Sequence, residues 1–105
     1  MQHTLEILSD IGAVRARSMF GGWGIYADGT MFGLVADDVL YLKTAEENRA
    51  AFVAHGLETF MYQSKEKCVA TSYYRAPDDA FDGREVMTHW AMSALGAAAR
   101  QRRKA

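Results

Sequence analysis

The stretch that decides the fold runs from residue 22 to residue 43 and reads GWGIYADGTMFGLVADDVLYLK. It contains three apolar runs of strand length, separated by two pairs of turn-forming residues. The runs are residues 22–27, 30–35 and 39–43, and the pairs are Asp28-Gly29 and Asp37-Asp38. An Asp-Gly pair between two hydrophobic runs favours a two-residue hairpin, and tight turns join antiparallel neighbours. The stretch therefore predicts an antiparallel meander of three strands.

The sequence on either side of this meander adds further strands and helices. Alternating residues predict strands over residues 14–19, 59–64 and 69–74, and the turn Lys65-Glu66-Lys67 joins the last two. Apolar spacing and punctuation predict helices over about residues 3–11, from Thr44 to His55, and over about 83–102. In the second helix, Thr44 and Glu47 are expected to form a capping box, and Gly56 to end the helix. Residues 77–79 are predicted to be a loop.

The order of the elements indicates the fold class. One helix, four strands, a second helix, two strands and a third helix follow one another, without a crossover helix after each strand. This order is typical of an α+β fold, in which an antiparallel sheet carries helices on one face and forms two layers. In the last helix, the expected core positions are Val86, Trp90, Ala94 and Ala97, flanked by Met87, Ala91, Leu95 and Ala98. With 105 residues, one domain over residues 1–105 is expected.

Composition excludes several classes of protein. Half of the residues are hydrophobic and the formal net charge is −1, so neither wholesale disorder nor a uniformly basic surface is expected. No apolar run approaches the length of a membrane span, and the first ten residues lack the features of a signal peptide. Cys68 is the single cysteine, which excludes an intramolecular disulfide and suits a cytoplasmic location. We expect Cys68 to be a semi-buried strand residue without a catalytic role.

The sequence contains no recognisable motif for a catalytic site or a metal site. The run Gly21-Gly22-Trp23-Gly24 opens a strand rather than a helix, so a tight bend or bulge is expected there rather than a phosphate loop. The histidines fall on different elements, at His3, His55 and His89. The paired carboxylates Asp37-Asp38 and Asp78-Asp79 both fall in turn contexts. The sequence therefore predicts no catalytic residue, no metal site and no cofactor.

Two groups of residues are candidates for binding. Arg15 and Arg17 fall on one face of a strand, and exposed aromatic residues near them would complete a stacking or protein-binding surface. This candidate interaction surface comprises Arg15, Arg17, Trp23, Tyr74 and Arg75. The second group is a short basic tail at residues 100–105, whose candidate nucleic-acid contacts are Arg100, Arg102, Arg103 and Lys104. Four charges alone are too few for tight DNA binding at physiological salt.

A set of motifs in order along the chain resembles a known family. The motifs include RSMFGGWGIY at residues 17–26, DGTMFGLV at 28–35, LYLK at 40–43, AEENR at 45–49, FMY at 60–62 and SYYRAP at 72–77. Together with Gly56 and the Trp90-Ala91 pair of the last helix, they resemble the N-terminal domain of the TfoX/Sxy family over roughly residues 5–100.

This resemblance implies a two-layer α+β domain and a regulatory role. The best-known members of the family regulate natural competence in bacteria, as transcriptional co-activators with a cyclic-AMP receptor protein. The family brings no established enzymatic activity, cofactor or catalytic residue. We therefore expect a non-enzymatic regulatory module that binds a protein partner, by resemblance the transcription machinery, and no membrane. A nucleic-acid-binding protein that uses its basic tail, a small-ligand binder or enzyme, and a homodimer stay open as alternatives.

Overall fold

The structure is a computed structural model that describes residues 2–19, 22–63 and 65–104. The described strands form one sheet of six strands, in the order β1-β2-β3-β4-β6-β5, and all neighbours are antiparallel. They are β1 (Val14–Met19), β2 (Gly22–Ala27), β3 (Thr30–Ala36), β4 (Val39–Lys43), β5 (Thr59–Gln63) and β6 (Cys68–Arg75). The helices are α1 (Gln2–Ile7), α2 (Glu46–Ala54) and α3 (Arg84–Lys104), with short 3-10 helices η1 (Ser9–Ile11) and η2 (Asp78–Asp82). The predicted α+β class is confirmed.

Both predicted turns of the meander are two-residue hairpins. Asp28 and Gly29 have φ values of 50° and 75°, and they connect Ala27 to its partner Thr30. Asp37 and Asp38 also have positive φ values, 51° and 62°. Such turns match the right-handed twist of the strands that they connect. The Asp-Gly prediction is therefore confirmed, and the second turn adopts the same backbone handedness without a glycine.

Two local features shape the packing within the meander: the backbone of Gly22 lies close to that of Val35, and β2 and β3 are joined through a β-bulge. A Cβ atom on Gly22 would lie 2.2 Å from the carbonyl oxygen of Val35, so only glycine fits at the start of β2. Between β2 and β3 the register shifts, because Ile25 pairs with Gly33 whereas Tyr26 pairs with Met31. The shift leaves one extra residue in β3, as expected of a β-bulge.

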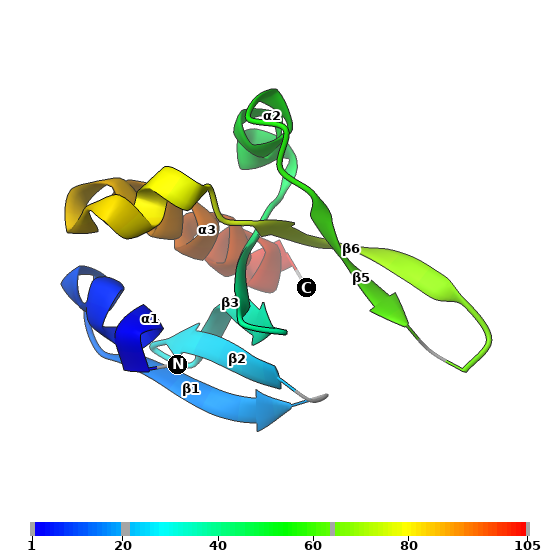
Figure 1. Cartoon of the computed structure of the whole chain (residues 1–105), viewed down its shortest axis with the longest axis horizontal. Coiled ribbons are helices and arrows are strands. Elements are labelled where there is room, and N and C mark those ends of the chain that lie inside the picture. Colours follow the sequence, from blue (N-terminus) through cyan, green and yellow to red (C-terminus); the bar gives the residue numbers. More distant parts are fainter. Residues whose placement is uncertain (1, 20–21, 64, 105) are drawn as a thin grey trace.

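The helices lie against one face of the sheet. Figure 1 shows α3 running along one side of the strands, and α3 packs on β3, β4, η1 and η2. The largest fully buried side chains include Phe32, Phe52, Leu8, Ile25, Leu42 and Met87. On α3 the buried residues are Met87, Trp90, Ala91, Ala94, Ala97 and Ala98. The small alanine side chains let the helix backbone approach the sheet closely, and the two-layer prediction is confirmed.

Four local predictions differ from the structure. The first predicted helix is divided, because α1 ends at Ile7 and a 3-10 turn follows. Residues 77–79 are not a simple loop, since η2 begins directly after Pro77. Val86 was expected in the core but is 39% exposed, because the buried stripe of α3 passes through Met87 instead. Cys68 is exposed rather than semi-buried, since β6 begins beyond the body of the domain.

The predicted capping box of Thr44 and Glu47 is also wrong. The N-cap of α2 is Ala45, whose N–H donates to the side-chain oxygen of Asn48 over 2.7 Å. The Thr44 hydroxyl instead donates to the carbonyl oxygen of Ser72 on β6, over 2.8 Å. Glu47 pairs with Arg100 of α3, over 2.7 Å. A non-local partner for Thr44 therefore displaces the local cap.

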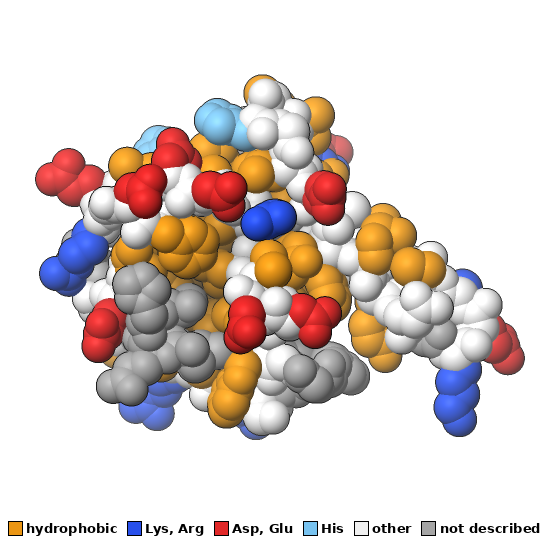
Figure 2. Space-filling view, viewed as in Figure 1, with side chains coloured by type: hydrophobic (Ala, Val, Ile, Leu, Met, Phe, Trp, Pro, Cys, Tyr) orange, Lys and Arg blue, Asp and Glu red, His pale blue; other side chains and the backbone are white. Residues whose placement is uncertain are grey.

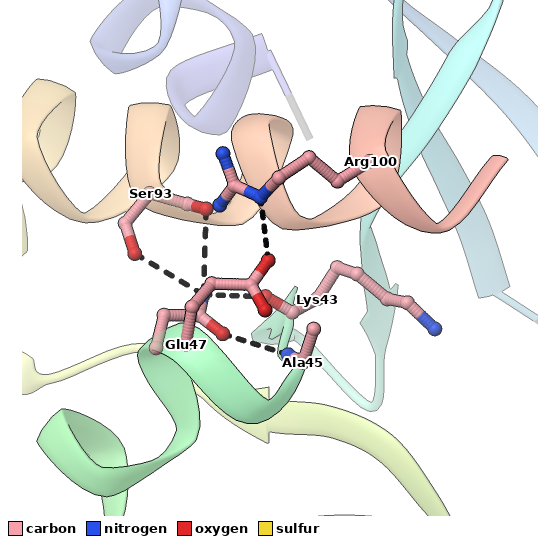
Figure 3. Close-up of polar contacts among 6 residues, drawn as sticks. Lys43, Ala45, Glu47, Ser93 and Arg100 are labelled. Atoms are coloured by element: carbon pink, nitrogen blue, oxygen red, sulfur yellow. Dashed lines mark hydrogen bonds and ion pairs between the residues drawn. The ribbon is translucent and has the colours of Figure 1, made fainter. Parts of the chain in front are cut away.

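Asn48 connects three elements at this junction. Its side-chain nitrogen lies 3.2 Å from the carbonyl oxygen of Lys43 and 3.1 Å from the Ser93 hydroxyl (Figure 3). Asn48 is 8% exposed, so these bonds form away from water. Buried amides are retained where their donors and acceptors are satisfied. The start of α2 is thus fixed both to the end of β4 and to α3.

Candidate interaction surfaces

The structure distributes the predicted interaction residues over two faces of the sheet. Arg15 pairs with Tyr26, which lies on the face away from the helices, and Arg17 lies two residues further along the same face. Trp23 pairs with the core residue Val35, so it lies on the helix-covered face, where it is 41% exposed. The five residues therefore do not form one continuous surface.

The tyrosine pair at the end of β6 divides in the same way. Tyr74 pairs with Leu42 and packs against the core, with its ring centroid 6.0 Å from that of Phe52. Tyr73 pairs with Lys43 on the opposite face. Tyr74 was predicted to belong to an exposed interaction surface, but it packs against the core, and the register assigns the position on the opposite face to Tyr73. Arg75 shares that face by register and forms an ion pair with the Asp78 side chain over 3.5 Å.

We call the sheet face opposite the helices the open face. By register it carries Arg15, Arg17, Tyr26, Met31, Leu34, Tyr41, Lys43, Tyr73 and Arg75. The hydrophobic and aromatic members of this set are only half-buried, and none belongs to the hydrophobic core. Sequence reasoning missed Lys43 and Tyr73 as members. The alternation of β4 and β6 could have indicated them only together with the pairing of these two strands.

Cations on the open face lie over aromatic rings. The guanidinium carbon of Arg17 is 5.9 Å from the centroid of the Tyr26 ring, and the ammonium of Lys43 is 5.2 Å from that of Tyr73. The Lys43 ammonium also donates to the Ser72 hydroxyl over 2.5 Å. These contacts hold the positive charges at the surface of the sheet, beside the rings.

Burial changes the titration of two groups on this face. Burial, with a smaller contribution from nearby Tyr26, raises the pKa of Tyr73 from 10.0 to about 12. Burial and the charge of Arg49 lower the pKa of Lys43. At neutral pH the Tyr73 hydroxyl is therefore a hydrogen-bond donor that does not ionise.

A second surface lies on the hairpin formed by β5 and β6, which we call the hairpin arm (residues 59–63 and 68–72). The arm projects from the body of the domain (Figure 1), and Figure 2 shows hydrophobic side chains along its base and charged side chains at its tip. Met61, Tyr62 and Val69 are 47%, 39% and 42% exposed. Tyr62 and Val69 pair on one side, whereas Met61 lies on the other. Apolar side chains are therefore exposed on both sides of the arm.

Residues 100–104 of the basic tail form the last segment of α3. Arg100 is 49% exposed in its side chain and pairs with Glu47, so part of its charge is engaged within the domain. The side chains of Arg102, Arg103 and Lys104 lie outside the described residues. Their binding role stays a prediction.

Neither surface has the residues of a metal site. Within the described part of the chain, no group of three His, Cys, Asp or Glu side chains converges to hold a metal ion. No described helix combines the length and the apolar character needed to cross a bilayer. The described surfaces expose apolar area, aromatic rings and positive charge.

The fold is that of a small α+β domain, and sequence comparison identifies its family. Residues 6–98 match the TfoX N-terminal domain, so the chain belongs to that family. The predicted resemblance is confirmed.

Two curated relatives are similar to the chain. "Protein Sxy" of Escherichia coli (strain K12) is 27% identical over 97 residues, which cover 92% of this chain and 46% of the relative. "DNA transformation protein TfoX1" of Aliivibrio fischeri (strain ATCC 700601 / ES114) is 36% identical over 69 residues, which cover 66% of this chain and 33% of the relative. The chain therefore aligns with less than half the length of each of these relatives.

Proposed function

We propose that the chain is a non-enzymatic regulatory module that acts by binding a protein partner. The observation that carries this proposal is the hairpin arm, with its exposed Met61, Tyr62 and Val69. Apolar and aromatic side chains that cluster on a projecting element are typical of protein-binding sites. The outer edge of β5 also has no neighbouring strand within the described sheet, so a partner strand has main-chain groups to pair with.

The regulatory part of the proposal is supported by family membership. A relative that matches this domain is named for DNA transformation, and the family resemblance implies regulation of natural competence. We extend this role to the present chain, with a component of the transcription machinery as its partner.

A pull-down from cell lysate, with and without nuclease, tests the proposal. The double variant Tyr62→Ser/Val69→Ser removes the apolar side chains from one side of the arm. The matched control is Val53→Ser, since Val53 is 58% exposed on α2, away from the arm. We expect a captured protein that survives nuclease, is lost with the arm variant and is retained with the control. The absence of any protein that stays captured after nuclease, or equal capture of that protein by both variants, would contradict the proposal.

Nucleic-acid binding through the basic tail is the alternative, and one contact weakens it. The guanidinium of Arg100 is bonded to Glu47 over 2.7 Å, which reduces its availability for phosphate. Neutralising the four basic residues of the tail leaves the arm unchanged, so the tail variant is expected to keep its protein partner. Loss of the partner only in the tail variant would favour the alternative.

A further inference from the structure

Two adjoining hollows lie along the open face. The first, of about 580 Å³, is lined by residues that include Arg15, Arg17, Tyr26 and Asp28. The second, of about 450 Å³, is lined by residues that include Tyr26, Lys43 and Tyr73 of the open face and Gln101 of α3, so it lies where the end of α3 reaches the edge of that face. Both hollows are broadly open to solvent. Tyr26 and Gly29 line both hollows, which are therefore neighbours.

The charge of these hollows is positive. Arg15, Arg17 and Lys43 contribute three cations, against the single carboxylate of Asp28 at the rim. Arg15 and Arg17 are exposed on the edge strand β1, two residues apart on the same face. The formal net charge of the whole chain is −1, so this concentration of positive charge is local. An anionic ligand is therefore the complementary one.

The aromatic rings indicate which chemical class of anionic ligand fits this site. Tyr26 and Tyr73 are held beside the cations, and Tyr73 keeps its hydroxyl proton at neutral pH. An ammonium group has three donors, of which Ser72 accepts one from Lys43. Phosphate groups fit such a set of cations and hydroxyl donors, whereas flat bases stack on aromatic rings. In a duplex the faces of the bases are covered by their neighbours, so only an unpaired strand offers both groups to this surface.

We propose that the open face binds single-stranded nucleic acid, with phosphates against Arg15, Arg17 and Lys43 and a base against Tyr26. This site is separate from the hairpin arm and does not depend on the protein-binding function proposed above. An acidic peptide would satisfy the cations but would make no use of the rings, and it is one of the outcomes that the experiment distinguishes.

Fluorescence anisotropy with a labelled 12-nucleotide oligothymidine, over a salt series, tests the proposal. The variant Arg15→Gln/Arg17→Gln removes two exposed cations from the site, and Lys65→Gln/Lys67→Gln removes two from the tip of the hairpin arm as a control of equal charge. Each phosphate contact on a single strand contributes about 0.7 to the salt slope of log K, so the first variant is expected to lower the slope by about 1.4. The control is expected to leave the slope unchanged.

Two further variants separate stacking from charge. Tyr26→Leu is expected to weaken binding by about 5-fold or more, while Tyr26→Phe, which keeps the ring, retains it. Asp28→Asn removes the rim carboxylate, and asparagine also tolerates the positive φ of this turn. It is therefore expected to increase the affinity for the oligonucleotide. A variant with a disturbed fold would lose affinity, so an increase cannot result from misfolding.

Several results would overturn the proposal. They are the absence of saturable binding at low salt, equal loss in the Lys65→Gln/Lys67→Gln control, a preference for the duplex, and equally good competition by polyglutamate. None of these results tests the hairpin arm. The protein-binding proposal is tested separately, by the variant Tyr62→Ser/Val69→Ser.

Discussion

Replacing Asn48 by alanine is expected to cost the domain a large part of its stability. The change removes the acceptor of the Ala45 N–H, at 2.7 Å, and the donor to the Lys43 carbonyl and the Ser93 hydroxyl, at 3.2 and 3.1 Å. An amide nitrogen carries two hydrogens, so the longer contact to the Ser93 carbonyl, at 3.4 Å, adds little. Three buried bonds at about 1 kcal/mol each give a loss of about 3 kcal/mol for Asn48→Ala.

Urea and thermal denaturation, followed by circular dichroism, measure this loss. For a domain of this size, 1 kcal/mol lowers Tm by roughly 4–8 °C, so Asn48→Ala is expected to lower Tm by more than about 10 °C. The control is Arg100→Gln, which removes the ion pair with Glu47 at the same junction of α2 and α3. Both side chains of that pair are 40% exposed or more, so its removal is expected to cost under about 1 kcal/mol. Equal losses for the two variants would refute the reasoning that burial makes the Asn48 bonds strong.

Three further predictions concern the turns, the close approach and the open face. Asp38→Gly is expected to stabilise the domain by about 0.5–1 kcal/mol in urea denaturation, because glycine adopts the φ of 62° without steric cost; a decrease in stability would contradict this. Gly22→Ala is expected to destabilise by about 1–3 kcal/mol, since its Cβ would overlap the Val35 carbonyl; an unchanged urea midpoint would count against the close approach. Because the pKa of Tyr73 is raised to about 12, its contribution to stability is present below about pH 10 and is lost as the pH rises toward 12. In Tyr73→Phe the free energy of unfolding is therefore expected to decrease less across this pH interval than in the wild type. Identical pH profiles for the two proteins would contradict this prediction.

Local signals explain how much of the fold could be predicted. The Asp28-Gly29 turn was predictable because its preference resides in two adjacent residues, and no distant contact opposes it. The ends of β1, β2 and β4 agree with the predicted bounds, since alternation and turn residues define them without reference to the rest of the chain. Thr44 failed as a cap for the opposite reason. Its partner, the Ser72 carbonyl, is 28 residues away in the chain, so the residues next to Thr44 do not indicate this contact.

The candidate surfaces were predictable only in part. Arg15 and Arg17 could be assigned to one face because they alternate within a single strand. The assignment of Tyr73 rather than Tyr74 to the open face needed the pairing of β4 with β6, which are not consecutive in the chain. The exposure of Met61 and Val69 also depends on tertiary structure, because an apolar strand in the sequence looks the same whether it is covered or projects from the body.

The pairing of β4 with β6 also has a consequence for how the chain folds. Every other pair of neighbours in the described sheet joins consecutive strands. In contrast, β4 and β6 are separated in the chain by α2 and β5, and they pair through Tyr41 to Lys43 and Arg75 to Tyr73. Contacts between strands close in sequence form first, because closing a short loop costs less entropy. We therefore expect the meander of β1–β4 and the hairpin of β5 and β6 to form early, and the pairing of β4 with β6 to form late. In the native state we therefore expect two levels of amide protection: the amides of the hairpin should exchange with solvent through local opening, and those of the meander only through global unfolding.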